Sequence, residues 1–563
     1  MGVSKTNPEK ATDSTGYAML DTGGSEVHQD PEKEKCMKMT SKTWLAVLLL
    51  AALCLPVFAS GAKETTVEPT AASSGAIVRG GTLVAGKTNK WSTLVPTRST
   101  SRGDDRYITS QIFDTLVSMD ESGNFVPMLA ESWEMQEKAM VMKLRSDVVF
   151  HDGTPFNAEA VKFIFDWYLG PDCKPIFASE ISAIKSVDIV DAYTVRFNLN
   201  EPSAILLSAL SNNAGMMMSP TAIKQYGNDI VLHPVGAGPF KMKEAVEGDH
   251  ITLVRNEQYY LKGKDGLPLP YLDEIVIRVI TDEPVKVTNL QSGDIDITDY
   301  LNAATSLDTL KTNKKIEVMK TTAGDHFALY PNHLHAPLND VRVRLAINYA
   351  LDKQTICNAL TRGYGNVAPF PVSAGQWFYN DYDPVSYNLE KAKQLLTEAG
   401  YPNGFSIKLQ NIAREPDNTI VQAVQSQLKQ VGIDVQIEGL ERNAWVALFA
   451  RNSDKGELAF GRWTFPRVDA YMQIYNNLGA TAIGNYSNYN NPKFTELLER
   501  TKSVYDVAER KGLFAQIQKV VLDDAANIWI YQMPRHIARN LMVQDLKTDQ
   551  EGIWILREVW MTK

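Results

Sequence analysis

The segment Leu129–Tyr168 restricts the fold of this 563-residue chain more than any other part of the sequence. Met140, Met142 and Leu144 alternate with other side chains, which is the period of a half-buried β-strand. The motif His-Asp-Gly-Thr-Pro follows at positions 151–155. It is typical of a tight turn, because glycine can take a positive φ and proline presets the bend. The first half of the segment therefore predicts a strand followed by a turn.

The second half of the segment predicts an amphipathic helix. Asn157 stands where a helix N-cap is expected, since its side chain can accept a hydrogen bond from the first turn. Apolar side chains then recur at helical spacing, at Val161, Ile164, Phe165 and Tyr168.

These residues resemble a family signature. Pro127–Trp133 matches the pattern P-x-L-A-E-S-W, and Leu144–Pro155 matches L-R-x-x-V-x-F-H-D-G-x-P. Both patterns belong to the extracellular solute-binding proteins of family 5, which serve ABC importers for oligopeptides, dipeptides, nickel and opines. Further family motifs follow in register along the chain, at Gly80–Leu83, Gly236–Phe240, Asp340–Arg344 and Gly432–Val435.

The resemblance implies an α/β fold: a two-lobed, periplasmic-binding-protein-like (type II) architecture with an additional N-terminal subdomain and a discontinuous first lobe. The alternation of strands and helices after residue 388 agrees with an α/β lobe. The implied divisions are 80–110 for the first part of lobe I, 111–220 for the extra subdomain, 221–328 for the second part of lobe I, 329–525 for lobe II and 526–563 for the C-terminal return to lobe I. The segment 341–360 is expected to be one long helix.

The N-terminal part of the sequence predicts that the protein is exported. Residues 1–36 are a disordered extension or the product of an upstream start codon, and residues 37–59 have the layout of a secretory signal peptide. The apolar run Trp44–Leu55 is shorter than the roughly 20 residues of a transmembrane helix. Residues 60–79 predict a flexible tether. Lipid anchoring through Cys54 stays open, although Leu53 is bulky for a lipobox.

Composition excludes some functions. A formal net charge of −9 and a pI near 5.6 argue against a nucleic-acid binder, whose footprint would be basic. Cys173 and Cys357 have no metal or redox spacing, and two separate buried thiols are favoured over a disulfide.

Two motifs resemble a nucleotide-binding site and a metal site, but the residues around them do not support either function. Gly81–Thr88 matches a nucleotide-binding P-loop, but its variable positions are β-formers and no helix pattern follows. His151-Asp152 has no second cluster of metal-ligating residues to complete a site. We therefore predict a protein that is not an enzyme and has neither cofactor nor metal.

The ligand site is predicted from a loop that the resemblance makes important. Family members carry G-W-x-x-D-Y-x-D-P, where the first aspartate pairs with a peptide α-amino group in some peptide binders. Trp463 and Asp469 match the aromatic and second acidic positions, whereas Pro466 replaces the first acid. Arg462 and Arg467 are candidates for a bidentate contact with a carboxylate or phosphate, or are solvated loop charges.

Two further residues complete the predicted site. Trp91 follows the first strand and Asn332 stands near the crossover to lobe II, both where the family approaches its ligand. The resulting hypothesis is an exported, monomeric protein, periplasmic or at the cell surface, that captures a small solute for an ABC permease and its ATPases. A short peptide is modestly favoured, while an oligosaccharide, an opine, a metal chelate and a sensor role remain alternatives.

Overall fold

The computed structural model describes residues 76–100, 102–120, 123–463 and 469–562. Residues 75–563 form a compact unit by themselves. The expected extension and signal peptide, and nearly all of the tether, lie outside the described residues. Within the described ranges, no helix has the length and apolarity needed to cross a membrane.

The largest element is an 11-stranded mixed sheet. Its order is β15 (Ile433–Leu440), β14 (Phe405–Ile412), β16 (Leu458–Trp463), β12 (Ile316–Pro331), β17 (Ile528–Asn540), β11 (Ile297–Thr298), β1 (Thr82–Lys87), β10 (Glu274–Val279), β9 (His250–Arg255) and β8 (Phe240–Val246), with β13 (Asn366–Val367) paired to β17. We call the part built on β1 and β8–β11 lobe I, and the part built on β14–β16 lobe II.

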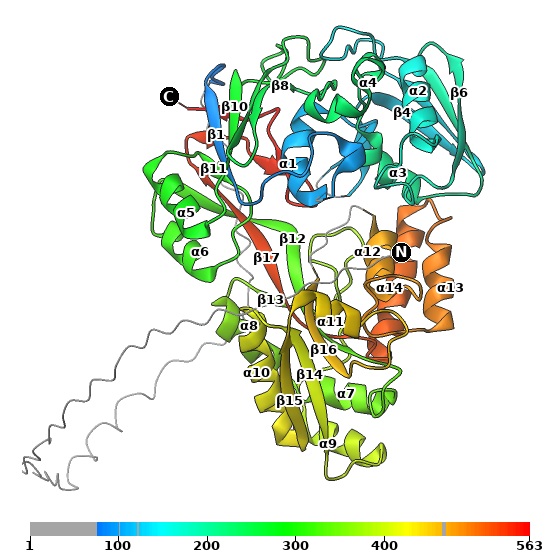
Figure 1. Ribbon diagram of the computed structural model, residues 1–563, viewed down its shortest axis with the longest axis vertical. Helices are drawn as coiled ribbons and strands as arrows, with labels where there is room; N and C mark the ends of the chain where they lie inside the picture. The colour runs from blue at the N-terminus through cyan, green and yellow to red at the C-terminus, as the bar shows by residue number, and fades with distance from the viewer. Residues whose placement is uncertain (1–75, 101, 121–122, 464–468, 563) are drawn as a thin grey trace, which may run out of the picture. The chain divides into compact units, whose positions relative to one another are not determined.

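Two long strands belong to both lobes. β12 and β17 contain 16 and 13 residues and pair antiparallel from Ile316 opposite Asn540 to Leu329 opposite Ile528. β17 also pairs with β11 of lobe I, and β12 with β16 of lobe II. In Figure 1 the two strands run from the elements around β11 to those around β16. Any movement of one lobe against the other must therefore bend or twist these strands.

A second sheet forms the subdomain. Its order is β4 (Ala130–Gln136), β5 (Ala139–Leu144), β7 (Thr194–Leu199) and β6 (Ile184–Asp191), and α2 (Ala158–Leu169) packs against it. Met140, Met142 and Leu144 are buried, as the alternation predicts. The Asn157 side chain accepts a 2.9 Å hydrogen bond from Ala160 N, so the predicted helix cap is confirmed.

The remaining helices lie around these sheets. Lobe I and the subdomain contain α1 (Arg102–Ile112), α3 (Ile205–Leu210), α4 (Pro220–Tyr226), α5 (Glu283–Ser292) and α6 (Ala304–Lys311). Lobe II contains α7 (Val341–Tyr349), α8 (Lys353–Thr361), α9 (Leu389–Glu398), α10 (Asp417–Leu428), α11 (Arg442–Leu448), α12 (Ala470–Leu478), α13 (Pro492–Arg500) and α14 (Val507–Asp523). Small pairs are formed by β2 (Val117–Met119) with β3 (Phe125–Pro127), β18 (Val543–Gln544) with β21 (Trp560–Met561), and β19 (Lys547–Thr548) with β20 (Trp554–Ile555).

The expectation of one helix over residues 341–360 is wrong. α7 ends at Tyr349 and α8 begins at Lys353. Asp352 takes a non-helical conformation, and its carboxylate accepts from Thr355 N at 3.0 Å, so it starts a new helix.

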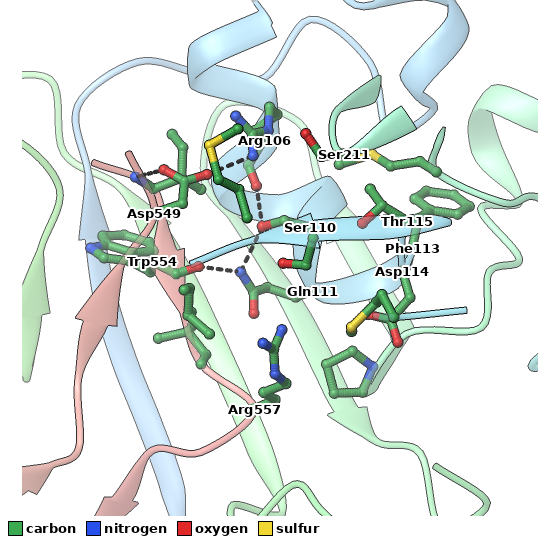
Figure 2. A pocket seen from close by; sticks show the side chains of 18 of the residues that line it. Arg106, Ser110, Gln111, Phe113, Asp114, Thr115, Ser211, Asp549, Trp554 and Arg557 are labelled. Atoms are coloured by element: carbon green, nitrogen blue, oxygen red, sulfur yellow. Dashed lines mark hydrogen bonds and ion pairs between the residues drawn. The ribbon is translucent and has the colours of Figure 1, made fainter. Parts of the chain in front are cut away.

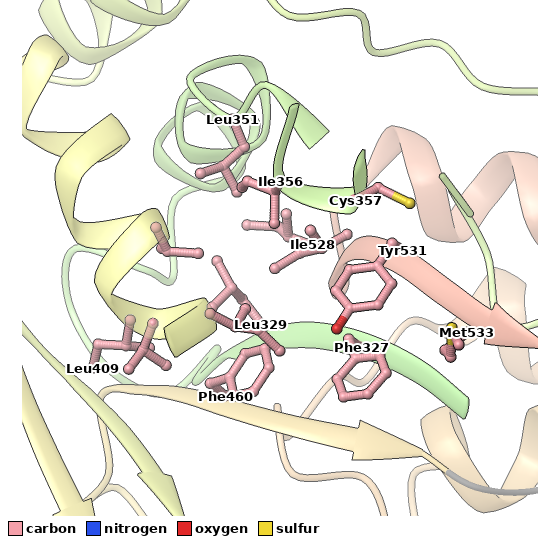
Figure 3. Packing of buried hydrophobic residues seen from close by; sticks show 14 of the residues in the cluster. Phe327, Leu329, Leu351, Ile356, Cys357, Leu409, Phe460, Ile528, Tyr531 and Met533 are labelled. Atoms are coloured by element: carbon pink, nitrogen blue, oxygen red, sulfur yellow. The ribbon is translucent and has the colours of Figure 1, made fainter. Parts of the chain in front are cut away.

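Aromatic side chains on the two shared strands pack against each other and against β16 of lobe II. The Phe327 ring on β12 stacks on Tyr531 of β17, with ring centroids 4.5 Å apart, and faces Phe460 of β16 (Figure 3). Cys357 lies in the same cluster and Cys173 in the subdomain core; both are buried free thiols, as the spacing favours.

Candidate functional site

A β-bulge interrupts the shared strands where they pass between the lobes. Lys320 lies opposite His536 and Gly324 opposite Pro534, so residues 321–323 of β12 face Arg535 alone. Such a bulge locally redirects side chains. The Thr321 hydroxyl donates to the backbone oxygen of Arg535 at 3.1 Å, which fixes the main chain there.

The Arg535 side chain lies over an aromatic ring of lobe I. Its guanidinium carbon is 4.6 Å from the centroid of the Tyr300 ring, and Tyr300 Oη accepts a 2.8 Å hydrogen bond from Asn89. Burial lowers the pKa of Arg535, but Asp325 and other neighbouring groups more than offset this, so the pKa is raised overall. Arg535 is therefore a permanent cation at the boundary of the lobes.

Lobe II contributes a second charged pair at this boundary. Arg462, on β16, lies 3.7 Å from Asp325 on β12, which is within ion-pair range but too long for a hydrogen bond. The other carboxylate oxygen of Asp325 is buried and has no hydrogen-bond partner among the described residues. Arg462 is exposed, so its guanidinium can reorient toward a ligand.

The two predicted tryptophans lie in different lobes. Trp463 ends β16, is 8% exposed and packs near the Tyr486 ring, with centroids 6.2 Å apart. Trp91 is half-buried against the core of lobe I. Arg467 and Pro466 lie outside the described residues.

Asp469 is engaged in structural contacts. One carboxylate oxygen caps α12 by accepting from Met472 N at 3.1 Å. The other accepts from Ser208 and from Arg510, both at 2.9 Å. Its side chain is therefore satisfied by protein groups.

The side-chain amide of Asn332 makes all of its hydrogen bonds within lobe II. Its amide nitrogen donates to the backbone oxygens of Ser453 and Gly456 at 2.9 and 2.7 Å. Its oxygen accepts from Leu334 N and from the Asn488 side chain at 3.1 Å each. An amide has two donors and about two acceptor positions, so a ligand would have to displace one of these bonds.

The motif that imitates a P-loop is a strand. Lys87 ends β1 with a fully buried side chain, and burial lowers its pKa. Its ammonium lies 3.8 Å from Asp104. A P-loop lysine instead follows a glycine-rich turn at a helix N-terminus and reaches the phosphates.

His151 and Asp152 point to different partners. His151 donates from Nε2 to Gly238 O at 3.0 Å and accepts at Nδ1 from Gly236 N at 3.4 Å; burial lowers its pKa to about 4. Asp152 accepts from Thr154 N at 3.0 Å and so stabilises the turn, as predicted. No cluster of three or more potential metal ligands occurs among the residues that the structure describes.

A small pocket lies within lobe I and the subdomain, between α1 and the C-terminal segment (Figure 2). Arg106 pairs there with Asp549 at 2.6 Å, and Gln111 donates to Trp554 O at 3.0 Å. Burial raises the pKa of Asp114 to about 6. The pocket volume of about 80 Å³ suits a few water molecules, whereas ligand pockets occupy roughly 300–1,000 Å³. It is therefore too small for a dipeptide.

Two α/β lobes joined by shared strands, with charged groups at the junction, define the class of bilobal solute-binding proteins. The family model described as "Bacterial extracellular solute-binding proteins, family 5 Middle" matches residues 124–485. The chain belongs to this family, and the predicted family and two-lobed α/β fold are confirmed.

Individual relatives agree with this assignment. The chain is 28% identical to the glutathione-binding protein GsiB of Pectobacterium atrosepticum, over 75% of this chain and 83% of that protein. It is 29% identical to the probable D,D-dipeptide-binding periplasmic protein DdpA of Escherichia coli, over 82% and 90%. The solved structure of DppA, an ABC transporter-associated periplasmic binding protein from Helicobacter pylori in complex with the peptide STSA, is 28% identical. It matches with a TM-score of 0.69 over 86% of this chain and 99% of that one.

Sequence reasoning missed Arg535, Asp325 and Tyr300. Each is an ordinary residue in a strand or beside one, without a motif around it. Asp325 and Arg535 come together only when β12 pairs with β17, and Tyr300 joins them because it follows β11, which also pairs with β17. Long-range strand pairing is therefore the missing signal.

Proposed function

We propose that the protein captures a short peptide or peptide-like solute between its lobes and delivers it to an ABC importer. The observation that best supports this proposal is that β12 and β17 belong to both lobes and place Asp325 and Arg535 at the boundary of the lobes. The names of the glutathione-binding and D,D-dipeptide-binding relatives, and the peptide complex of DppA, support a peptide-class ligand.

Ligand contacts in this proposal come from both lobes. The solute is contacted directly by Trp91 on lobe I, by Trp463 and Arg462 on lobe II, and by Arg467. Asp469 acts through its hydrogen bond to Ser208 of the subdomain. Asn332 supports the site indirectly by holding the loop around residues 453–456.

Binding is coupled to closure. A ligand that contacts both lobes favours the closed form by its extra contacts there, and the closed form is what the permease recognises. The protein acts as an exported monomer with a signal peptide at 37–59, and it neither catalyses a reaction nor needs a cofactor.

A thermal-shift panel tests the proposal. The panel contains glutathione, the tetrapeptide Ser-Thr-Ser-Ala, a D,D-dipeptide, a disaccharide, an opine and a nickel–histidine chelate. At least one peptide-class compound is expected to raise Tm in a concentration-dependent way, because a ligand that binds only the native state stabilises it. A rise with only the disaccharide, opine or chelate, or with none of them, contradicts the peptide assignment.

A further inference from the structure

Two arginines stand apart from the rest in the described part of the chain. Among described arginine side chains that are not exposed, only those of Arg535 and Arg557 make neither a hydrogen bond nor an ion pair. Arg557 lines the small pocket of Figure 2. Burial lowers its pKa there, but Tyr259, Asp114 and other neighbouring groups more than offset this, so its pKa is raised overall. Arg535 lies at the lobe boundary, where a large solute would bind.

Arg535 is half-buried. Its side-chain nitrogens do not belong to the fully buried polar atoms that lack a partner. A nitrogen that neither bonds nor is buried must reach solvent-accessible space. No described carboxylate lies within 4 Å of them, so the charge of Arg535 has no ion-pair partner.

Three features of the structure restrict the position of Arg535. Its backbone oxygen is held by Thr321, and its guanidinium plane is supported by the Tyr300 ring. A Cβ on Gly324 would come within 2.5 Å of Gln532 Nε2 and 2.8 Å of the backbone oxygen of Met533, so the bulge beside Arg535 requires glycine. A guanidinium that packs on an aromatic face keeps its N–H groups free at the edge, where they match the two oxygens of a carboxylate.

We propose that Arg535, supported by Tyr300, binds a carboxylate of the captured solute, so that the ligand is an acid such as a peptide with a free C-terminus. This inference rests on the proposed function, since it names the chemistry of the same ligand. Arg462 lies on the opposite lobe and contacts Asp325 only at 3.7 Å, so it is available to a second anionic group.

The inference explains the charge balance at the boundary. Arg462 and Asp325 offset each other, and Lys87 is offset by Asp104. Arg535 has no described carboxylate within ion-pair distance, and Asp325 and Asp104 act on its charge only from further away. A ligand carboxylate would neutralise it, whereas an amide or ester at that position would leave it without a partner.

The test compares free acids with their C-terminal amides by isothermal titration calorimetry. The probes are Ser-Thr-Ser-Ala and D-alanyl-D-alanine and the C-terminal amide of each, because each of these two peptides has a single carboxylate. Wild-type protein is expected to bind an acid at least about tenfold more tightly than its amide, because a charge-assisted, bidentate contact is lost. This comparison needs no variant, so it holds even if substitutions impair folding.

Variants then test whether Arg535 is responsible for the preference for the acid over the amide. In Arg535→Gln the acid and amide are expected to bind within about twofold of each other, and Arg535→Lys is expected to keep part of the preference as a point charge. Arg539→Gln is the matched control, since Arg539 lies on the same strand but is occupied by Glu317 at 2.7 Å and should leave the preference intact.

The outcomes separate the two claims. Equal binding of acid and amide by the wild type, or an undiminished preference in Arg535→Gln, overturns the carboxylate assignment while leaving peptide capture standing. Failure of the wild type to bind either acid or glutathione overturns both.

Discussion

The Ser208 hydroxyl donates a 2.9 Å hydrogen bond to Oδ2 of Asp469 and so joins α3 of the subdomain to the N-terminus of α12 in lobe II. Arg510 of α14 donates to the same oxygen at 2.9 Å, and the side chains of Arg510 and Asp469 are 7% and 5% exposed. Beside them, Ala204 N donates to Lys502 O at 2.6 Å. A buried, charge-assisted contact therefore holds the two parts together in this conformation.

Removing the Asp469 carboxylate is expected to be costly. Asp469→Ala leaves the buried Arg510 without its anion and α12 without its cap, so the free energy of unfolding should fall by about 3–5 kcal/mol. Ser208→Ala removes one neutral donor and should cost about 1 kcal/mol. Urea denaturation measures both changes.

A second capping aspartate provides the control. Asp506 caps α14 through Glu509 N at 2.8 Å but is exposed and lacks a buried arginine partner. Asp506→Ala should therefore cost only about 1 kcal/mol. If Asp469→Ala costs no more than this control, the buried pair does not stabilise the fold as described.

Stability is expected to decrease as pH falls from about 6.5 to 4. Burial holds the pKa of His326 at about 3 and those of His151, His333 and His536 at about 4. Unfolded histidines titrate near pH 6.5, so below that pH the unfolded chain binds protons that the native protein does not. The native state therefore loses stability in this window.

Asp114 opposes this trend. Its native pKa of about 6 exceeds the unfolded value, so the native state gains a proton where the unfolded chain does not. Net uptake on unfolding near pH 5.5 should be roughly two to three protons, and Asp114→Asn should raise it by about one. Denaturation curves at several pH values measure this uptake. Stability that is constant or rises between pH 7 and pH 5 contradicts the burial of these histidines.

Two glycine substitutions are expected to change stability in opposite directions. Gly324→Ala places a Cβ against the Met533 backbone, and overpacking of this kind costs about 1–3 kcal/mol. Gly512 lies exposed within α14 with open space at its Cβ position, so Gly512→Ala should stabilise the protein by about 0.5–1 kcal/mol. Thermal denaturation of both variants checks the signs. A neutral Gly324→Ala would mean that β12 does not pack on β17 as closely as described.

Local patterns predicted local structure well. The alternation at Met140–Leu144 and the cap at Asn157 depend only on neighbours in sequence, and both are confirmed. The break between α7 and α8 was missed because the helical pattern was followed through Asp352, whose capping role competes with the interior of a helix.

The site was predicted only where a motif marked it. Asp469 stands just before a helix, so its cap could have been recognised, but its contact with Ser208 spans 261 residues and leaves no trace in a local pattern. Arg535 has no motif at all, since its importance comes from the Tyr300 ring beneath it and from the absence of an ion-pair partner among the described residues.

The central claim is that a solute is captured by closure of the lobes about β12 and β17, and small-angle X-ray scattering tests it most directly. The radius of gyration of the purified protein is measured alone and with a saturating concentration of the compound that raises Tm most. The account predicts a smaller radius with the compound present. A radius that stays the same while calorimetry shows the compound bound would contradict capture by closure.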